Sequence, residues 1–306
     1  MKVLIATQKP FAAAAVKGIR EILEGAGHEV VLLEKYAEAK DLIDAVADVE
    51  AMIIRSDKVT PEVLDAAKKL KIVVRAGAGF DNVDLAAATA HGVVVENTPG
   101  QNANAVAELA IALMIFMSRN QFTPVSGIEV QCKKRGIQAF GNVGRLVGKK
   151  AEARGRKVLA IDPFIPAEKI AEAGAEPIAS VKELYAASDF ISIHIPATPE
   201  TIGSIGYDLI TSMPKGATLI NTARKEVIDE AGLEKALEDR PDLKYAADVA
   251  PDNIDVLREK FGTRVFATPK KMGAQTAEAN INAGLAAARQ IVAYFADGCT
   301  KFQVNK

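Results

Sequence analysis

Residues 135–162 read RGIQAFGNVGRLVGKKAEARGRKVLAID, and this stretch decides the fold. It begins with a short, mostly apolar run, turns at residues 140–144, continues as a helical pattern rich in Lys and Ala, and ends in a second apolar run closed by Asp162. A glycine turn between a strand and a helix lets backbone N–H groups approach a phosphate, and the helix N-terminus adds partial positive charge. The order of these parts predicts a dinucleotide-binding βαβ unit.

The glycine pattern departs from Gly-x-Gly-x-x-Gly at its first position. Residues 139–144 read AFGNVG, so Ala139 stands where a glycine usually makes the turn, while Gly141 and Gly144 remain for phosphate approach and helix packing. An ordinary strand-to-helix turn has the same pattern, but the flanking strands and the terminal acid favour a nucleotide site. Asp162 would accept ribose hydroxyls, which predicts NAD as the cofactor. The residues expected to bind it here are Ala139, Gly141, Asn142, Val143, Gly144 and Asp162.

Two arginines bear on the choice between NAD and NADP. Arg154 and Arg156 lie just before the strand that ends at Asp162, where a positive charge would weaken the preference for NAD. The acid itself repels a 2′-phosphate, so the sequence still predicts that NAD is preferred.

Composition limits the classes of protein that the chain can belong to. With 306 residues and 49% hydrophobic residues, it is long enough for two domains. The formal net charge of −1 leaves no basic stripe for nucleic acid and no polybasic patch for a membrane. The longest uncharged apolar run, residues 109–117, is far shorter than the roughly 20 residues of a membrane span. We therefore expect a soluble protein with small-molecule partners.

The cysteines and the first residues point to the compartment. Cys132 and Cys299 are too few for a disulfide framework or a zinc site, so we expect no metal and a reducing environment. The opening MKVLIATQKP is too short for the apolar core of a signal peptide and is typical of a first strand. We expect a cytoplasmic location.

Apolar runs alternate with helical patterns along the whole chain, which predicts an α/β protein with parallel sheets covered by helices. The expected strands are residues 3–6, 30–33, 52–54, 72–74 and 93–95, and then residues 158–161, 190–195, 217–221, 245–249 and 265–267. Residues 102–119 and 275–295 are expected to form long helices. We predict two doubly wound parallel-sheet domains: a substrate-binding domain of residues 1–98 and 286–306, and a Rossmann nucleotide-binding domain of residues 99–285.

Several motifs, in order, resemble those of the D-2-hydroxyacid dehydrogenases, and the resemblance covers essentially all of the chain. The family's substrate loop is similar to RAGAGFDNVD (75–84), and its crossing motif is similar to NTPGQNANAVAE (97–108). The segment that carries its catalytic arginine resembles NTARKEVID (221–229). Its later cofactor and catalytic segments resemble HIPATPET (194–201), AADVA (246–250) and TPKKMGAQT (268–276). Within the family, the chain is most similar to the short phosphoglycerate dehydrogenases. From its end soon after the last helix, we expect no regulatory domain and no inhibition by serine.

The substrate loop carries the first candidate site. Glycines between Arg75 and Asp81 free the backbone to form a concave anion nest for a carboxylate, with Arg75, Ala76 and Gly77 as its expected residues; a flexible turn is the alternative. Arg55 and Lys58 follow an expected strand and are either surface charges or ligands of a substrate phosphate. The crossing motif adds Asn102 to the substrate-binding residues.

The second site lies where open α/β sheets bind ligands, at the carboxyl ends of strands. Arg224 follows the expected strand 217–221, and its guanidinium can grip a carboxylate and a keto oxygen together, although a lone arginine is more often a solvated charge. The resemblance implies that His194, Thr222, Ala223 and Asp248 contact the cofactor.

The family's acid/base histidine has no counterpart in residues 268–276. Counting back from Gly273 places Lys271 at its position, and counting forward from Pro269 places Lys270 there; two solvated lysines are the alternative. We favour Lys271, because the turn and helix after Gly273 fix geometry more strongly than a strand end does. Asn253 stands where the family has a glutamate. A carboxylate would hold a lysine charged, whereas a general base must release its proton, from a pKa of about 10.4 in a free lysine. We therefore expect the loss of the family's histidine and the loss of its glutamate to be coupled.

The resemblance implies NAD-dependent oxidation of 3-phospho-D-glycerate, with Lys271 as acid/base and Arg224 holding the substrate. Asp252 is an alternative carboxylate beside the lysine. The competing functions are a glyoxylate, hydroxypyruvate or other 2-keto-acid reductase, and a non-catalytic NAD-sensing interaction protein. We expect a homodimer formed through the nucleotide domain.

Overall fold

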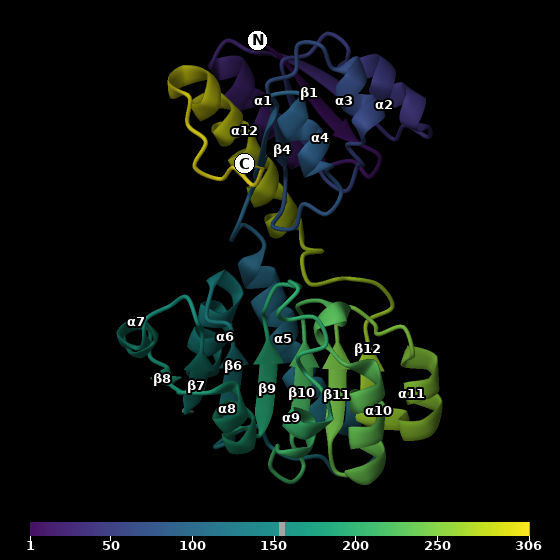
Figure 1. Cartoon of the computed structure of the whole chain (residues 1–306), viewed down its shortest axis with the longest axis vertical. Helices are drawn as coiled ribbons and strands as arrows, with labels where there is room; N and C mark the ends of the chain where they lie inside the picture. The colour runs from purple at the N-terminus through teal and green to yellow at the C-terminus, as the bar shows by residue number, and fades with distance from the viewer. Residues whose placement is uncertain (153–156, 306) are drawn as a thin grey trace. The chain divides into compact units, whose positions relative to one another are not determined.

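The computed structural model describes residues 1–152 and 157–305, which divide into two compact units (Figure 1). Unit 1 is Met1–Asn102 with Gln275–Lys306, and unit 2 is Ala103–Ala274. The sequence placed these boundaries after residues 98 and 285, so both are corrected. Helix α12 (Ala277–Asp297) is continuous and buries Ala283, Ala287 and Ile291 in the core of unit 1. A helix that packs along its length into one core cannot be shared between two, and the chain therefore returns to unit 1 before α12 begins.

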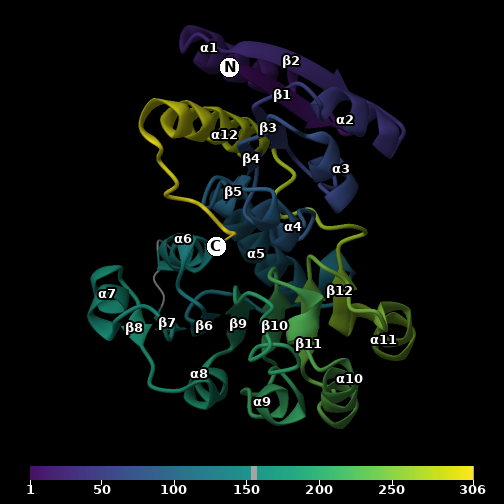
Figure 2. The ribbon, with the colours of Figure 1, turned by 45° about the horizontal axis from the view of Figure 1, so that its top comes forward.

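Unit 1 is built on a parallel five-stranded sheet with the order β2-β1-β3-β4-β5. Its strands are β1 (Lys2–Thr7), β2 (Glu29–Glu34), β3 (Ala51–Ile54), β4 (Ile72–Arg75) and β5 (Val94–Asn97). Helices α1 (Ala13–Gly25) and α12 lie side by side on one face, and α2 (Ala39–Val46), α3 (Pro61–Ala66) and α4 (Leu85–Ala90) cover the other (Figures 1 and 2). Because both faces are buried, the inner strands are apolar at nearly every position.

The last residues of the chain pair with β5. The backbone N–H of Val304 donates to the Val95 carbonyl at 2.8 Å. The Asn305 side chain, 4% exposed, accepts a hydrogen bond from the Val95 N–H at 2.7 Å and donates to the Val93 carbonyl at 2.9 Å and to Thr89 Oγ1 at 3.0 Å. These bonds tie residues 302–305 to unit 1.

Unit 2 contains a seven-stranded sheet in which all neighbouring strands are parallel, with the order β12-β11-β10-β9-β6-β7-β8. The strands are β6 (Arg135–Gln138), β7 (Val158–Ile161), β8 (Glu176–Pro177), β9 (Phe190–Ile193), β10 (Thr218–Asn221), β11 (Lys244–Ala247) and β12 (Val265–Ala267). The chain order reverses between β6 and β9. This switch point is where open α/β sheets bind ligands at the carboxyl ends of their strands.

Helices cover both faces of this sheet as well. One face packs against α5 (Ala103–Ser118), α6 (Asn142–Glu152) and α7 (Ala167–Glu172), and the other against α8 (Val181–Ala187), α9 (Tyr207–Thr211), α10 (Glu230–Asp239) and α11 (Ile254–Phe261). Short 3₁₀ turns complete the unit at η1 (Asn120–Phe122), η2 (Lys225–Val227) and η3 (Gly262–Arg264). The predicted α/β fold with two doubly wound parallel sheets is confirmed. Among the described residues, no helix has the length and apolar character to span a bilayer.

Asn305→Ala should lower the free energy of unfolding by about 2–4 kcal/mol, because it leaves the buried Val95 N–H and Val93 carbonyl without partners. Urea denaturation would measure the loss. Thr300→Ala, which changes an exposed side chain of the same segment, is the control and should stay within about 0.5 kcal/mol of the wild type. Equal effects of the two substitutions would contradict this role of Asn305.

Candidate functional site

The turn between β6 and α6 depends on the absence of side chains at two positions. A Cβ on Gly144 would lie 2.2 Å from the Ala139 carbonyl oxygen, so no other residue fits there without movement of the backbone. A Cβ on Gly141 would have no atom within 4 Å, which leaves space in front of the N-terminus of α6. Ala139 adopts a φ of +73°, the left-handed conformation that glycine usually provides at this point of the motif. The turn therefore keeps glycine-like geometry despite the alanine.

Asp162 follows β7 and contacts this turn. Its Oδ2 accepts a hydrogen bond from the Phe140 N–H and its Oδ1 accepts one from the Phe164 N–H, both at 2.8 Å. Each carboxylate oxygen can accept a further bond, so ribose recognition by Asp162 stays a prediction. Arg154 and Arg156 lie outside the described residues.

His194 follows β9, on the other side of the switch point. Its Nε2 lies 2.9 Å from Ser192 Oγ, its Nδ1 lies 3.2 Å from Thr222 Oγ1, and its backbone N–H donates to the Gln138 carbonyl. Burial lowers the pKa of His194 to about 3, so the ring is neutral at working pH. A neutral imidazole held by two hydroxyls can position a polar group, but it does not exchange protons near pH 7.

Asn221 holds the segment that carries Arg224. This side chain is fully buried at the end of β10, where its amide donates to the Arg224 carbonyl at 2.8 Å and its Oδ1 accepts from the Ala223 N–H at 2.9 Å. Thr222 and Ala223 are also buried in this turn. Arg224 donates from Nη1 to the Ala223 carbonyl, and its chain is partly exposed beyond it. The Asn221 side chain therefore fixes the backbone of the turn from which the Arg224 guanidinium extends.

Asp248 follows β11 and is 1% exposed. Its carboxylate accepts hydrogen bonds from two consecutive backbone groups, the Met272 N–H at 2.7 Å and the Gly273 N–H at 2.8 Å. A Cβ on Gly273 would lie 2.9 Å from Asp248 Oδ2, so glycine permits this approach. A contact between Asp248 and the cofactor stays a prediction, and its main observed role is to hold the loop after β12.

That loop carries both candidate lysines, and the side chains of Lys270 and Lys271 are exposed. Asp252, the alternative carboxylate, pairs with Lys225 at 2.5 Å. The Asn253 amide lies 3.5 Å from the Glu230 carbonyl and from the Glu234 carboxylate, both on α10.

In unit 1, Arg75 ends β4 and folds over the glycine loop. Its Nε donates to the Arg55 carbonyl at 2.9 Å, and a Cβ on Gly77 (φ +149°) would lie 1.5 Å from its Nη1. The Ala76 N–H donates to the Ile54 carbonyl and so belongs to the sheet rather than to an anion nest. The loop is further held by Asn97, whose amide donates to the Ala78 carbonyl. The glycine at position 77 thus makes room for the arginine as well as for the turn.

Arg55 has structural partners within unit 1. Its Nη1 donates to the Lys9 and Pro10 carbonyls, and its Nη2 donates to Asn280 Oδ1 on α12. Lys58 is exposed. Asn102 is partly exposed directly before α5. The bonds of Arg55 account for its position without a substrate, and substrate binding by these three residues stays a prediction.

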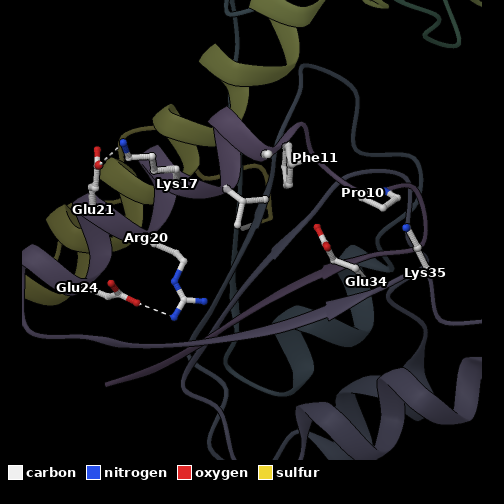
Figure 3. A pocket seen from close by; sticks show the side chains of 10 residues that line it. Pro10, Phe11, Lys17, Arg20, Glu21, Glu24, Glu34 and Lys35 are labelled. Atoms are coloured by element: carbon white, nitrogen blue, oxygen red, sulfur yellow. Dashed lines mark ion pairs between the residues drawn. The ribbon is translucent and has the colours of Figure 1, made fainter.

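Unit 1 also has an open pocket of about 650 Å³ between α1 and the end of β2 (Figure 3). Lys17 pairs with Glu21 at 3.8 Å and Arg20 with Glu24 at 2.8 Å along its rim. None of the predicted site residues lines it. Arg55 contacts two of the lining residues, since it donates to the Pro10 carbonyl and lies over the Phe11 ring.

Comparisons with known proteins agree with this arrangement. The model of the D-isomer specific 2-hydroxyacid dehydrogenase catalytic domain matches residues 5–305, and the chain belongs to this family. It is similar to the crystal structure of NAD⁺-bound 3-phosphoglycerate dehydrogenase from Entamoeba histolytica, with 50% identity and a TM-score of 0.90 over 100% of this chain and 99% of that one. The resemblance inferred from the motifs is confirmed.

Two curated relatives are the D-3-phosphoglycerate dehydrogenases of Methanocaldococcus jannaschii and Archaeoglobus fulgidus. Each is 36% identical to this chain, over 270 and 312 residues, which is 82% and 95% of this chain. These matches cover 51% and 57% of the relatives, so the chain spans about half their length.

The sequence patterns did not single out three polar side chains that hold the candidate loops. Asn97, Asn221 and Thr268 lie at or just after the carboxyl ends of strands. Asn221 and Thr268 contact the loop that follows their own strand, and Asn97 donates to Ala78 in the loop after the neighbouring strand β4. The signal was present, because a buried polar side chain ending an apolar strand needs a hydrogen-bond partner.

Gly141→Ala and Gly144→Ala should differ in their effects on the free energy of unfolding and on NAD binding. At residue 141 the methyl group enters open space, so stability should stay within about 1 kcal/mol while NAD affinity falls, because the methyl group blocks phosphate approach. At residue 144 it meets backbone, and unfolding free energy should fall by about 2–4 kcal/mol. Thermal denaturation and NAD titration would measure both. A destabilised Gly141→Ala with normal NAD affinity would contradict the assignment.

His194→Gln should make stability less dependent on acid pH. Because the folded-state pKa of His194 is about 3, the unfolded chain takes up a proton below pH 6.5 that the folded chain refuses, so wild-type stability falls with pH through this range. Between pH 7 and 4.5 the wild type should lose about 2 kcal/mol more than the variant. Urea unfolding at the two pH values measures the difference, and parallel losses would show that His194 is protonated in the folded state.

Proposed function

We propose that the chain oxidises 3-phospho-D-glycerate to 3-phosphohydroxypyruvate with NAD, the first step of phosphorylated serine biosynthesis. The observation that carries the proposal is the 50% identity to the NAD⁺-bound 3-phosphoglycerate dehydrogenase, because that match extends over nearly the full length of both chains. Two more distant relatives with the same name support it.

The turn after β6 fits a dinucleotide. The open space at Gly141 and the N-terminus of α6 suit a pyrophosphate, and the Asp162 carboxylate, beside the same turn, suits the ribose hydroxyls of NAD. Thr222, Ala223 and His194 lie on neighbouring strand ends and would contact the rest of the cofactor. When bound, NAD supplies the acceptor for a hydride from C2 of the substrate.

Arg224 and Lys271 are the proposed catalytic residues. The Arg224 guanidinium would hold the substrate carboxylate and the oxygen on C2, where carbonyl character develops. The Lys271 amine would take the proton from the C2 hydroxyl group. We favour Lys271 over Lys270 because it stands two residues before Gly273, whose N–H is fixed by Asp248. Asp252 is engaged with Lys225, so we do not propose it as the partner of Lys271.

Substrate binding would draw on the loop after β4. Backbone N–H groups from Gly77 onward, together with the Arg75 side chain, would receive an anionic group, and Lys58 and Arg55 are the candidates for the phosphate. Asn102 would add a polar contact.

We further propose a homodimer formed through unit 2, in the cytoplasm. The segment between α5 and β6 carries large apolar side chains at Phe122, Val125 and Ile128, which are 70%, 64% and 43% exposed. Clustered exposed apolar residues are typical of an interface. The two free thiols suit a reducing compartment.

Steady-state kinetics with paired substrates tests the function. The value of kcat/KM for 3-phospho-D-glycerate should exceed that for unphosphorylated D-glycerate and D-lactate by at least about 100-fold, because charged partners in the site are otherwise left unpaired. The value of kcat/KM with NAD should exceed that with NADP by a similar factor, because the Asp162 carboxylate repels the 2′-phosphate of NADP. Faster reduction of glyoxylate or hydroxypyruvate than of 3-phosphohydroxypyruvate would favour a reductase. NAD binding without turnover would favour an interaction protein.

Lys271→Ala should lower kcat by about 10²- to 10⁴-fold with little change in NAD affinity, the usual effect of losing a general acid or base. Lys270→Ala is the matched control, because it removes the same charge from the neighbouring exposed position, and it should stay within a few-fold of the wild type. Reversal of this order would assign the proton transfer to Lys270.

A further inference from the structure

The loop that carries Lys271 is held by a buried polar cluster that includes the side chain of Thr268. Thr268 directly follows β12 and is 6% exposed. Its Oγ1 lies 2.7 Å from the Asp248 carbonyl oxygen, 3.0 Å from Asp248 Oδ1 and 2.8 Å from the Lys270 carbonyl oxygen. The hydroxyl group therefore touches the end of β11 and the loop after β12 at once.

These contacts connect to the backbone of Lys271 through a short chain of bonds. The Asp248 carboxylate receives the N–H groups of Met272 and Gly273, the two residues that follow Lys271. Thr268 contacts the same carboxylate and the carbonyl of the residue that precedes Lys271. The main chain is thus bonded to Asp248 immediately after the lysine, and the Thr268 hydroxyl group contacts it immediately before.

We propose that Thr268 is a positioning residue for the reaction, and that with Asp248 it forms a clamp that sets the backbone from which Lys271 reaches the substrate. The hydroxyl group has one proton and three acceptors within reach. Donation to an Asp248 oxygen joins the end of β11 to the loop, and donation to the Lys270 carbonyl closes the turn directly before Lys271. The role of Lys271 rests on the proposed function, while the clamp itself is a feature of unit 2 alone.

A positioning clamp matters because the lysine side chain is exposed and long. A flexible four-carbon chain reaches a productive geometry often only if its Cα is fixed, and a misplacement of about 1 Å costs on the order of 100-fold in rate. The bonds from the Met272 and Gly273 N–H groups to Asp248 supply this restraint on the main chain.

Thr268→Val and Thr268→Ser test the clamp as a matched pair. Valine keeps the shape and removes the hydroxyl group, so kcat with 3-phospho-D-glycerate should fall about 10- to 100-fold while the KM for NAD changes less than about threefold. Serine keeps the hydroxyl group and should restore kcat to within about threefold of the wild type. Amide hydrogen exchange should quicken at Met272 and Gly273 in the valine variant and stay slow in the serine variant.

The outcomes separate the clamp from the proposed function. If valine lowers kcat no more than serine does, and exchange at Met272 and Gly273 is unchanged, the clamp is wrong although the enzyme is active. If the wild type does not oxidise 3-phospho-D-glycerate, the function fails and the exchange data still decide the clamp. Should the valine variant not fold, the wild-type measurement remains: fast exchange at both amides would overturn the proposal, and protection at both would support it.

Discussion

The carbonyl oxygen of Ala139 occupies the position into which a side chain on residue 144 would project, 2.2 Å from the Cβ that glycine lacks. Because glycine leaves this space free, α6 starts directly after the end of β6, which lies between β7 and β9 in the unit 2 sheet. Residue 139 adopts the left-handed conformation, and the Phe140 N–H that follows it donates to Asp162. The close backbone contact, the turn and Asp162 are thus linked at the carboxyl end of β6.

In each unit, buried or half-buried polar side chains hold the loops at the strand ends. Asn221 stabilises the Arg224 turn, Asp248 and Thr268 hold the lysine loop, and Asn97 stabilises the glycine loop of unit 1. Each of these side chains forms hydrogen bonds with backbone groups of a loop that have no partner within the loop itself. The loop backbone thereby gains hydrogen bonds like those that the strands form within a sheet. The side chains proposed for chemistry, Arg224 and Lys271, are partly or fully exposed, while the side chains that hold their loops are buried.

The sheets could be predicted from sequence because most positions of strands buried on both faces are apolar, and the acid of the nucleotide motif follows one of these strands. The second domain boundary could not be predicted, because α12 runs as one helix from residue 277 past residue 285 and its sequence has no break that marks where the chain enters unit 1. Arg55 was equally open to a surface or a phosphate role, and its bonds to Lys9, Pro10 and Asn280 depend on segments far away in sequence. The hydrogen bond between Asp248 and the Met272 N–H also joins segments far apart in sequence, so the spacing of residues in the sequence could not predict it.

The pairing of residues 302–305 with β5 has a consequence for how the protein behaves in concentrated solution. An outermost strand offers a row of unpaired N–H and carbonyl groups that can recruit a strand from another molecule. On β5 the Val95 groups are taken by Val304 and Asn305, so this side of the sheet cannot act as a template for aggregation. On the opposite outer strand, β2, glutamates stand at both ends and Leu32 is 39% exposed, so protection there rests on charge repulsion alone among the features described.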